Sequence, residues 1–302
     1  MEDSVLPAYK TGFVAVMGRP NVGKSTLVNV LLKQKIAAVS PRPQTTRKRQ
    51  MGILTLEDAQ VIFVDTPGVH RPRHKLGENM NQEAIKTLQE SDLVLFMVDA
   101  SQEPNPEDQM LANLLSKLKR SIPVLLLLNK DDLPDETALT AHTTAYQELA
   151  PQARPLAISA TRGDNLGQLL AEILALLPEG MPFFPEGQVT DLYEREIAAD
   201  LIREAALLLL RDEVPHGIAI RIDQYLERGD TGSYIEATLF VERESHKGIV
   251  IGQGGTMLKK IGTTARHEIE AMSGRIVFLK LKVKVRKNWR DDEETLRSLG
   301  LK

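Results

Sequence analysis

Residues 13–177 alternate short apolar runs with stretches of helical periodicity. The runs at 13–18, 91–100 and 122–130 are apolar almost throughout, which is typical of parallel strands buried on both faces. Helical patterns at 107–120 and 164–177 fall between or after them. Strands that alternate with helices predict right-handed crossovers, and therefore an α/β fold with a doubly wound, mostly parallel sheet.

A different pattern follows a proline- and glycine-rich segment at 178–187, which cannot continue the preceding helix. The pattern predicts a long amphipathic helix at 191–215, and strands at 216–227 and 232–243 joined by the turn sequence RGDTG. Two helices and a strand at 275–287 complete an αββααβ order. We therefore expect one domain at 1–178, a linker at 179–187 and an α+β domain at 188–302.

The chain length fits this division, because 302 residues are more than a single hydrophobic core usually holds. Apolar content of 42% and charged content of 26% are ordinary for a soluble globular protein. The absence of cysteine excludes disulfides and thiolate metal sites. The N-terminus lacks the pattern of a signal peptide, and the longest apolar run, at 124–128, is too short to span a bilayer. We expect a soluble, intracellular chain.

The net charge of −3 conceals an uneven distribution. Residues 245–290 hold eleven Lys or Arg against two acidic residues, a net charge of +9, so the remainder carries −12. A local basic block indicates a surface for a polyanion. A solvated basic face explains the charge equally well.

The apolar run at 13–18 leads into a glycine-rich loop that fits G-x-x-x-x-G-K-[ST], and a helical pattern follows. In that setting the glycines let backbone N–H groups turn inward around a β-phosphate. Lys24 can reach the β and γ oxygens, and Ser25 can bind Mg²⁺ through its hydroxyl. We predict a nucleotide site that includes Gly18, Arg19, Pro20, Asn21, Val22, Gly23, Lys24, Ser25 and Thr26.

The sequence NKDD follows the buried run and therefore lies at a strand's carboxyl edge, where open α/β sheets bind ligands. The Asp132 carboxylate can accept hydrogen bonds from N1–H and the N2 amino group of guanine, whereas adenine presents an acceptor at N1. A backbone N–H near Ser159 could bond guanine O6. The predicted base site is formed by Asn129, Lys130, Asp132, Ser159 and Ala160.

The sequence VDTPG ends a further strand at 64–68 and supplies Asp65, Thr66, Pro67 and Gly68 to the site. Asp65 is expected to hold Mg²⁺, and the Gly68 N–H to sense the γ-phosphate. The segment PQTTR at 43–47 offers a threonine for Mg²⁺, Thr46 or otherwise Thr45. The residues expected to take part in catalysis are Lys24, Thr46 and Gly68. In isolation DTPG would be a plain turn, but its place in this ordered set favours the nucleotide site.

These five elements resemble the motifs of translation-factor-class GTPases. The resemblance implies GTP/GDP and Mg²⁺ as cofactors and hydrolysis of GTP to GDP and phosphate. Val69 stands where Ras-like proteins carry a water-orienting glutamine, so we expect slow intrinsic turnover. Asn21 resembles an asparagine that helps hold K⁺ beside the phosphates in some of these GTPases.

A second glycine-rich loop at 252–255 lacks the Lys-[ST] pair, so a triphosphate and its Mg²⁺ would find neither cation nor hydroxyl there. Within an αββααβ order it resembles the type II K-homology (KH) domain, in which G-x-x-G joins two helices and clamps single-stranded RNA. A plain helix-connecting turn is the alternative. The expected RNA-binding residues are Lys247, Ile251, Gly252, Gln253, Gly254, Gly255, Lys259, Lys260, Lys280 and Lys282.

The closing strand alternates apolar residues with Lys280, Lys282, Lys284 and Arg286, which places these cations on one face. A row of cations on one face is explained equally well by exposure of that face to solvent and by contact with RNA. Trp289, just beyond the strand, is expected either to pack or to stack on a base.

A GTPase domain followed by a type II KH domain resembles the bacterial Era family nearly end to end, and the stretches QTTR, DTPG, HKLGENMN and KNWRDD agree with it. The resemblance implies binding near the 3′ end of small-subunit ribosomal RNA in the GTP form and assistance to maturation of the small ribosomal subunit. It also implies a cytoplasmic protein with peripheral membrane association. We expect a monomer.

The mechanistic hypothesis is that GTP and Mg²⁺ order Thr46 and the segment after Gly68, which changes how the KH domain is presented. Two alternatives stay open. In one, the basic domain of a GTPase binds protein or anionic membrane instead of RNA. In the other, the chain is an RNA chaperone with a degenerate nucleotide site.

Overall fold

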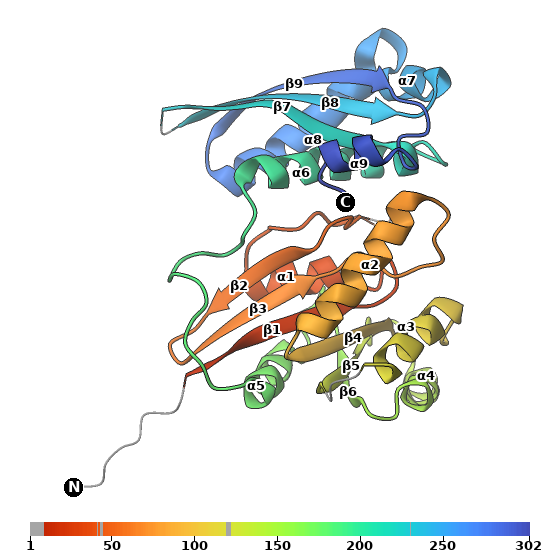
Figure 1. The fold of residues 1–302 in the computed structure, drawn as a ribbon, viewed down its shortest axis with the longest axis vertical. Coiled ribbons are helices and arrows are strands. Elements are labelled where there is room, and N and C mark those ends of the chain that lie inside the picture. The colour runs from red at the N-terminus through yellow and green to blue at the C-terminus, as the bar shows by residue number, and fades with distance from the viewer. Residues whose placement is uncertain (1–8, 41, 43–44, 119–121, 230) are drawn as a thin grey trace, which may run out of the picture. The chain divides into compact units, whose positions relative to one another are not determined.

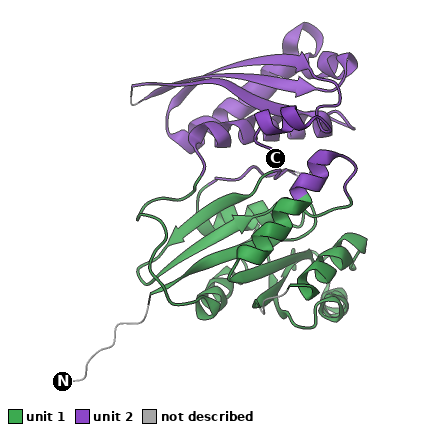
Figure 2. Ribbon diagram, in the orientation of Figure 1, with its two compact units in different colours: residues 1–34, 48–71, 81–191 green, residues 35–47, 72–80, 192–302 purple. Residues whose placement is uncertain are grey.

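The computed structural model describes residues 9–40, 42, 45–118, 122–229 and 231–302. The chain divides into two compact units (Figure 2). Unit 1 holds residues 1–34, 48–71 and 81–191, and unit 2 holds residues 35–47, 72–80 and 192–302. The segment that carries Thr45, Thr46 and Arg47 therefore groups with unit 2.

Residues 179–187, expected as a linker, pack on unit 1. Gly180 N–H donates to the Tyr9 carbonyl at 3.0 Å, and just beyond the segment Ile53 N–H donates to the Val189 carbonyl at 2.9 Å. The Gln60 side-chain oxygen accepts from the N–H groups of Phe183 and Phe184 at 2.8 and 3.0 Å. These bonds extend unit 1 to residue 191, because backbone groups of the segment find their partners there.

Unit 1 is built around a six-stranded sheet in the order β2-β3-β1-β4-β5-β6, in which only β2 runs antiparallel to its neighbour. This confirms the predicted doubly wound sheet. Its elements are β1 (Lys10–Met17), α1 (Lys24–Leu32), β2 (Gln50–Thr55), β3 (Ala59–Asp65), α2 (Lys75–Glu90, whose first residues group with unit 2), β4 (Leu93–Asp99), α3 (Pro106–Ser116), β5 (Val124–Asn129), α4 (Glu136–Leu149), β6 (Arg154–Ile158) and α5 (Leu166–Leu176).

Both faces of this sheet are covered. Ala15 and Met17 belong to a core cluster with residues of α2, α3 and α4, whereas Val14 and Val16 on the opposite face are also fully buried. In Figure 1, α2 lies in front of the sheet and α1 behind it. Because β1, β3, β4, β5 and β6 are parallel, their carboxyl ends meet at one edge, where the predicted nucleotide-binding loops begin.

Unit 2 follows the predicted αββααβ order. Its elements after the crossover are α6 (Glu194–Leu209), the 3₁₀ turn η1 (Pro215–Gly217), β7 (Ala219–Arg228), β8 (Gly232–Val241), α7 (Glu244–Ile251), η2 (Gln253–Gly255), α8 (Thr256–Ser273), β9 (Ile276–Val285) and α9 (Glu293–Ser298). The sheet order is β7-β8-β9, with β7 antiparallel and β9 parallel to β8. Helices α6 and α8 cover one face of it (Figure 1).

Two predicted helices are shorter than their patterns. The helix expected at 191–215 ends at Leu209, because Leu210 is extended, Asp212 adopts a positive φ of 54° and Pro215 starts a 3₁₀ turn. The helix expected at 107–120 ends at Ser116, and residues 119–120 lie outside the described ranges. So do Gln44 of QTTR, Asp230 of the RGDTG turn and residues 1–8. Among the helices of the described ranges, none combines the length and apolar character that crossing a bilayer requires.

Candidate functional site

The phosphate loop between β1 and α1 has a shape that requires its two glycines. A Cβ on Gly18 would lie 2.3 Å from the Met97 carbonyl oxygen. Gly23 adopts φ +106°, and a Cβ there would lie 2.4 Å from Asn129 Nδ2. Any larger residue would therefore push the loop away from the strands beneath it.

Lys24 lies buried inside this loop. Its ammonium donates to the carbonyls of Gly18 and Arg19, both at 3.0 Å. Burial lowers the pKa of the Lys24 ammonium to about 8, against the raising influence of Asp65 and Glu107. A triphosphate placed in the loop would add negative charge next to this buried ammonium and so favour its charged form.

Ser25 and Asp65, the predicted Mg²⁺ ligands from the first and third motifs, lie together. The Ser25 hydroxyl donates to Asp65 Oδ2 at 2.6 Å, and the carboxylate is fully buried at the end of β3. A hydroxyl and a carboxylate are the hard oxygen ligands that Mg²⁺ prefers. No group of three His, Cys, Asp or Glu side chains in the described residues could hold a metal by itself. Ser25 and Asp65 therefore fit an ion that shares its coordination with nucleotide phosphates, whose charge it would neutralise.

The remaining predicted switch residues differ in position. A Cβ on Gly68 would lie 2.8 Å from Pro20 N, so the DTPG turn packs directly on the phosphate loop. Val69 is buried in the core cluster that includes α2 and α3, which leaves the attacking water to be positioned by another group. Thr46 is buried and groups with unit 2, and its role as a Mg²⁺ ligand stays a prediction. The Thr45 hydroxyl donates to the Arg42 carbonyl at 2.8 Å.

Asn129 joins three loops at the predicted base site. Its Nδ2 donates to the Val22 carbonyl at 2.7 Å, and its Oδ1 accepts from Ala160 N–H at 2.9 Å. Asp132, three residues further along the chain, has an exposed side chain. A carboxylate that binds a base must be accessible in this way. The side chain of Asn129 therefore holds the phosphate loop and the Ser159-Ala160 loop in fixed relation.

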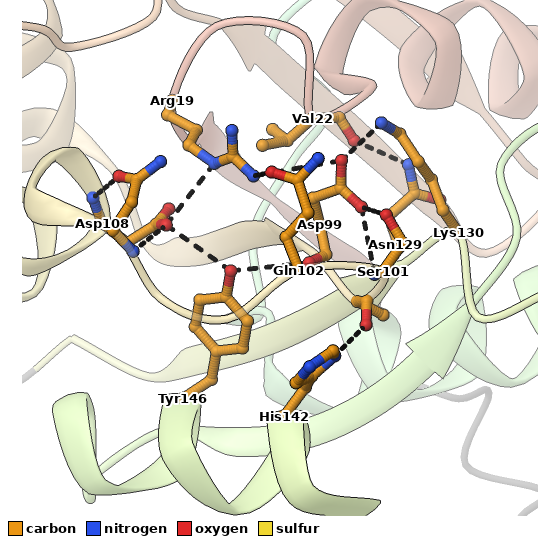
Figure 3. Close-up of polar contacts among 12 residues, drawn as sticks. Arg19, Val22, Asp99, Ser101, Gln102, Asp108, Asn129, Lys130, His142 and Tyr146 are labelled. Atoms are coloured by element: carbon orange, nitrogen blue, oxygen red, sulfur yellow. Dashed lines mark hydrogen bonds and ion pairs between the residues drawn. The ribbon is translucent and has the colours of Figure 1, made fainter. Parts of the chain in front are cut away.

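A charged network that the sequence analysis did not identify anchors these loops (Figure 3). Arg19 Nη2 donates to Gln102 Oε1 at 2.9 Å, and Arg19 Nε lies 3.4 Å from the fully buried Asp108 carboxylate. Lys130 Nζ donates to Asp99 Oδ2 at 2.5 Å. Burial works against ionisation of Asp99, but hydrogen bonds from Lys130 and Ser101 outweigh it and hold the pKa of Asp99 below its usual range.

The second glycine loop differs from the first. It connects α7 to α8, as predicted, and Gly252, Gly254 and Gly255 all adopt positive φ, at 72°, 58° and 80°. No atom lies within 4 Å of a Cβ built on Gly254 or Gly255, so the backbone there is open. An open loop of this kind lets a large ligand approach the backbone closely.

A groove of about 550 Å³ adjoins this loop and combines apolar and basic groups. Its lining residues are Gly255, Leu258, Lys259, Gly262, Thr263, Arg266, Leu279 and Leu281. Of the predicted RNA-binding lysines, Lys259 lines the groove. Lys280 and Lys282 are not among its lining residues, because they alternate with Leu279 and Leu281 along β9 and point to the opposite face.

Unit 2 also holds the segment that precedes β2. Arg47 is buried, and its guanidinium donates to the carbonyls of Ile218 and His216 at 2.6 and 3.0 Å. The same group lies 5.5 Å from the ring centroid of Trp289. Trp289 is fully buried, and its Nε1 donates to the Gly217 carbonyl at 2.9 Å. Of the two expectations for Trp289, packing is correct.

Comparisons with known proteins agree with both halves of the chain. Residues 13–130 match the family described as a 50S ribosome-binding GTPase, and residues 213–290 match the KH domain family. A GTPase Era of Ruminiclostridium cellulolyticum is 46% identical over 296 residues, which cover 98% of each chain. A GTPase Era of Caldicellulosiruptor saccharolyticus is 47% identical over 296 residues, covering 97% of this chain and 98% of that protein.

The chain belongs to the GTPase Era family. A crystal structure of Era in complex with MgGDPNP and nucleotides 1506–1542 of 16S ribosomal RNA has a TM-score of 0.92 to this structure at 39% identity, covering 97% of this chain and 99% of that one. As a member of the Era family the chain is a GTPase, which hydrolyses GTP to GDP and phosphate.

Two features of this Era family member were missed from sequence for different reasons. Asp99 is the first charged residue after the apolar residues 93–98, so its place at the carboxyl edge of β4 was a usable signal. The contact of Arg47 with Trp289 joins segments far apart in the chain, and no local pattern marks it.

Proposed function

We propose that the chain is a guanine-nucleotide switch that binds single-stranded RNA from the 3′ region of small-subunit ribosomal RNA and assists maturation of the small subunit. The observation that carries this proposal is that the two glycine-rich loops of the chain differ in structure. The loop at 18–25 encloses a buried lysine, whereas the loop at 252–255 is open at Gly254 and Gly255 and lies beside a basic groove.

The groove suits a single RNA strand. Lys259 and Arg266 offer positive charge for phosphates, and Leu258, Leu279 and Leu281 offer an apolar surface for unstacked bases. The RNA complex of the Era relative supports the same assignment. A protein or an anionic membrane as the partner of unit 2 is the alternative that the experiment below separates.

We further propose that nucleotide state controls RNA affinity through the segment at 35–47. Arg47 holds this segment within unit 2, and Thr46 is the predicted third ligand of Mg²⁺. Recruitment of Thr46 by GTP and Mg²⁺ would change the contacts of the segment. Since Lys35 also pairs with Glu204 and Glu268, at 2.9 and 2.7 Å, the change would reach α6 and α8.

A K⁺ ion beside the phosphates, held in part by Asn21, is proposed from the resemblance alone. A bound K⁺ ion predicts faster GTP hydrolysis in potassium than in sodium buffer, and equal rates would contradict the K⁺ proposal.

A monomeric, cytoplasmic protein with peripheral membrane association is likewise proposed from resemblance. Gel filtration and cell fractionation test these points.

The decisive experiment measures RNA binding and GTP hydrolysis on the same preparations. Gly254→Asp adds a negative charge to the open loop without a packing clash, and we expect it to abolish binding to single-stranded RNA while hydrolysis persists. Gly187→Asp, at another open position with φ +86°, is the matched control. Lys24→Ala should abolish hydrolysis. No RNA binding by the unmodified chain would favour the protein or membrane alternative, and hydrolysis that survives Lys24→Ala would refute the nucleotide site.

A further inference from the structure

The unit 2 sheet carries an exposed apolar row on the face turned away from α6 and α8. Leu226, Tyr234 and Phe278 lie directly opposite one another on β7, β8 and β9. Their neighbours Ile235 and Val277 point the other way, into the core. Phe278 is 63% exposed and Leu226 46% exposed, so a large part of this row remains accessible to a partner.

The rings in this row form a flat stack. The centroids of Tyr234 and Phe278 are 5.6 Å apart, and their planes differ by only 11°. On β7, the Arg228 guanidinium lies 5.2 Å from the Tyr234 ring centroid. Ile276, at the start of β9, is 76% exposed beside them. We name Leu226, Arg228, Tyr234, Ile276 and Phe278 the outer platform.

Lysines continue the same face along β9. Lys280 and Lys282 follow Phe278 at intervals of two, and both pair with Glu236 on β8. The hydrogen bond from Lys282 lowers the pKa of the Glu236 carboxyl to about 2, so the carboxylate stays ionised and keeps both ammonium groups at the surface. Lys284 is exposed further along the strand. The face therefore presents several cations beside a flat aromatic surface.

This combination favours a nucleic acid over the other partners. Bases stack on aromatic side chains and guanidinium planes, and sheets that bind single strands use such rings together with nearby cations. A bilayer would also attract the lysines, but insertion buries a whole apolar face at the headgroup boundary, whereas Lys280, Lys282 and the Glu236 carboxylate stand on this same face beside the rings. The planar stack and the charge thus fit a base and its phosphates.

The position of β9 links the outer platform to the groove beside the glycine loop. β9 is the edge strand of its sheet. Leu279 and Leu281 line the groove on one face, while Phe278, Lys280 and Lys282 lie on the other. A single RNA strand held in the groove can therefore pass around this edge and reach the platform without crossing another element of the sheet.

We propose that the outer platform is a second RNA-contact surface, which takes unpaired bases that flank the nucleotides held at the 252–255 loop. A flanking base stacks on Phe278, and its phosphates lie near Lys280 and Lys282. This inference rests on the proposed RNA-binding function and deepens it, because it assigns a role to residues outside the groove.

The test uses the full chain with a non-hydrolysable GTP analogue and two synthetic single-stranded RNAs from the 3′ region of 16S ribosomal RNA. One has about four nucleotides, enough for the glycine loop, and the other carries unpaired extensions on both sides. We expect Phe278→Ser to weaken binding of the extended RNA about tenfold and to leave the short RNA unchanged. Phe278→Tyr keeps a ring and should bind like the unmodified chain. Met181→Ser, at a position 84% exposed in unit 1, is the matched surface control.

The inference is overturned when Phe278→Ser binds the extended RNA as tightly as the unmodified chain, or when it weakens both RNAs equally. It is also overturned when the substitution removes binding to phosphatidylglycerol vesicles or to a ribosomal protein while RNA binding is unchanged. Failure of the proposed function looks different, since the unmodified chain would then bind neither RNA and Gly254→Asp would change nothing.

Discussion

Burial in the phosphate loop changes the acid–base chemistry of Lys24. In the loop its pKa falls to about 8 because burial disfavours the charged form, whereas bound phosphates favour that form and raise the pKa again. Below pH 8 the free protein already carries the charge. Above pH 8 binding must take up a proton, so affinity falls as pH rises.

This predicts that GTP affinity is about tenfold weaker at pH 9 than at pH 7. Titration calorimetry in buffers of different ionisation enthalpy measures both the affinity and the proton uptake. Lys24→Arg keeps its charge throughout this range and should show no such slope. An equal slope in the arginine variant would show that another group is responsible.

Gly23 provides a second test at the scale of one residue. Gly23→Ala combines the strain of φ +106° with a contact 2.4 Å from Asn129 Nδ2, so it should displace Asn129 from Val22 and Ala160. Gly163→Ala has a similar φ of +84° with no atom within 4 Å, and isolates the strain of about 1–2 kcal/mol. We expect urea denaturation to show a larger loss of stability for Gly23→Ala, with GDP binding lost only there. Equal losses would mean that the contact with Asn129 is unimportant.

At the scale of elements, the segment at 35–47 depends on Arg47. Arg47→Ala leaves the carbonyls of His216 and Ile218 without this donor, and should lower the free energy of unfolding of unit 2 by about 1–3 kcal/mol. Hydrogen exchange of residues 45–47 should rise with it.

Arg49→Ala is the matched control, because Arg49 is part-exposed and pairs with Glu83 and Glu90 at 3.6 and 3.4 Å. Its loss should change stability by less than about 1 kcal/mol. Similar exchange in the two variants would contradict a special role for Arg47.

The strands and their loops were predictable, whereas the contacts between distant segments were not. Residues 61–64 before Asp65 and residues 124–128 before Asn129 are apolar, so the ends of these runs marked the sheet edge correctly. The alternation along β9 placed Lys280 and Lys282 on one face, but only the strand order shows that this face lies opposite the groove. Periodicity reports local geometry, and tertiary partners such as Arg47 and Trp289 leave no period.

At the scale of the whole molecule, we propose that the segment at 35–47, which belongs to unit 2, couples the GTPase unit to the RNA-binding unit. That segment, at 35–47, contains both a candidate Mg²⁺ ligand and the arginine that holds it in unit 2. A ligand shifts such an equilibrium only by its differential affinity for the two states. By linkage, RNA must then change GTP affinity by the same factor as GTP changes RNA affinity.

The most direct measurement is the affinity of the full chain for the extended 3′ ribosomal RNA, determined by fluorescence anisotropy with the GTP analogue and with GDP under one salt concentration. The account predicts tighter binding with the analogue, by about fivefold or more, and a smaller difference in Arg47→Ala. Equal affinities in the two nucleotide states would contradict it.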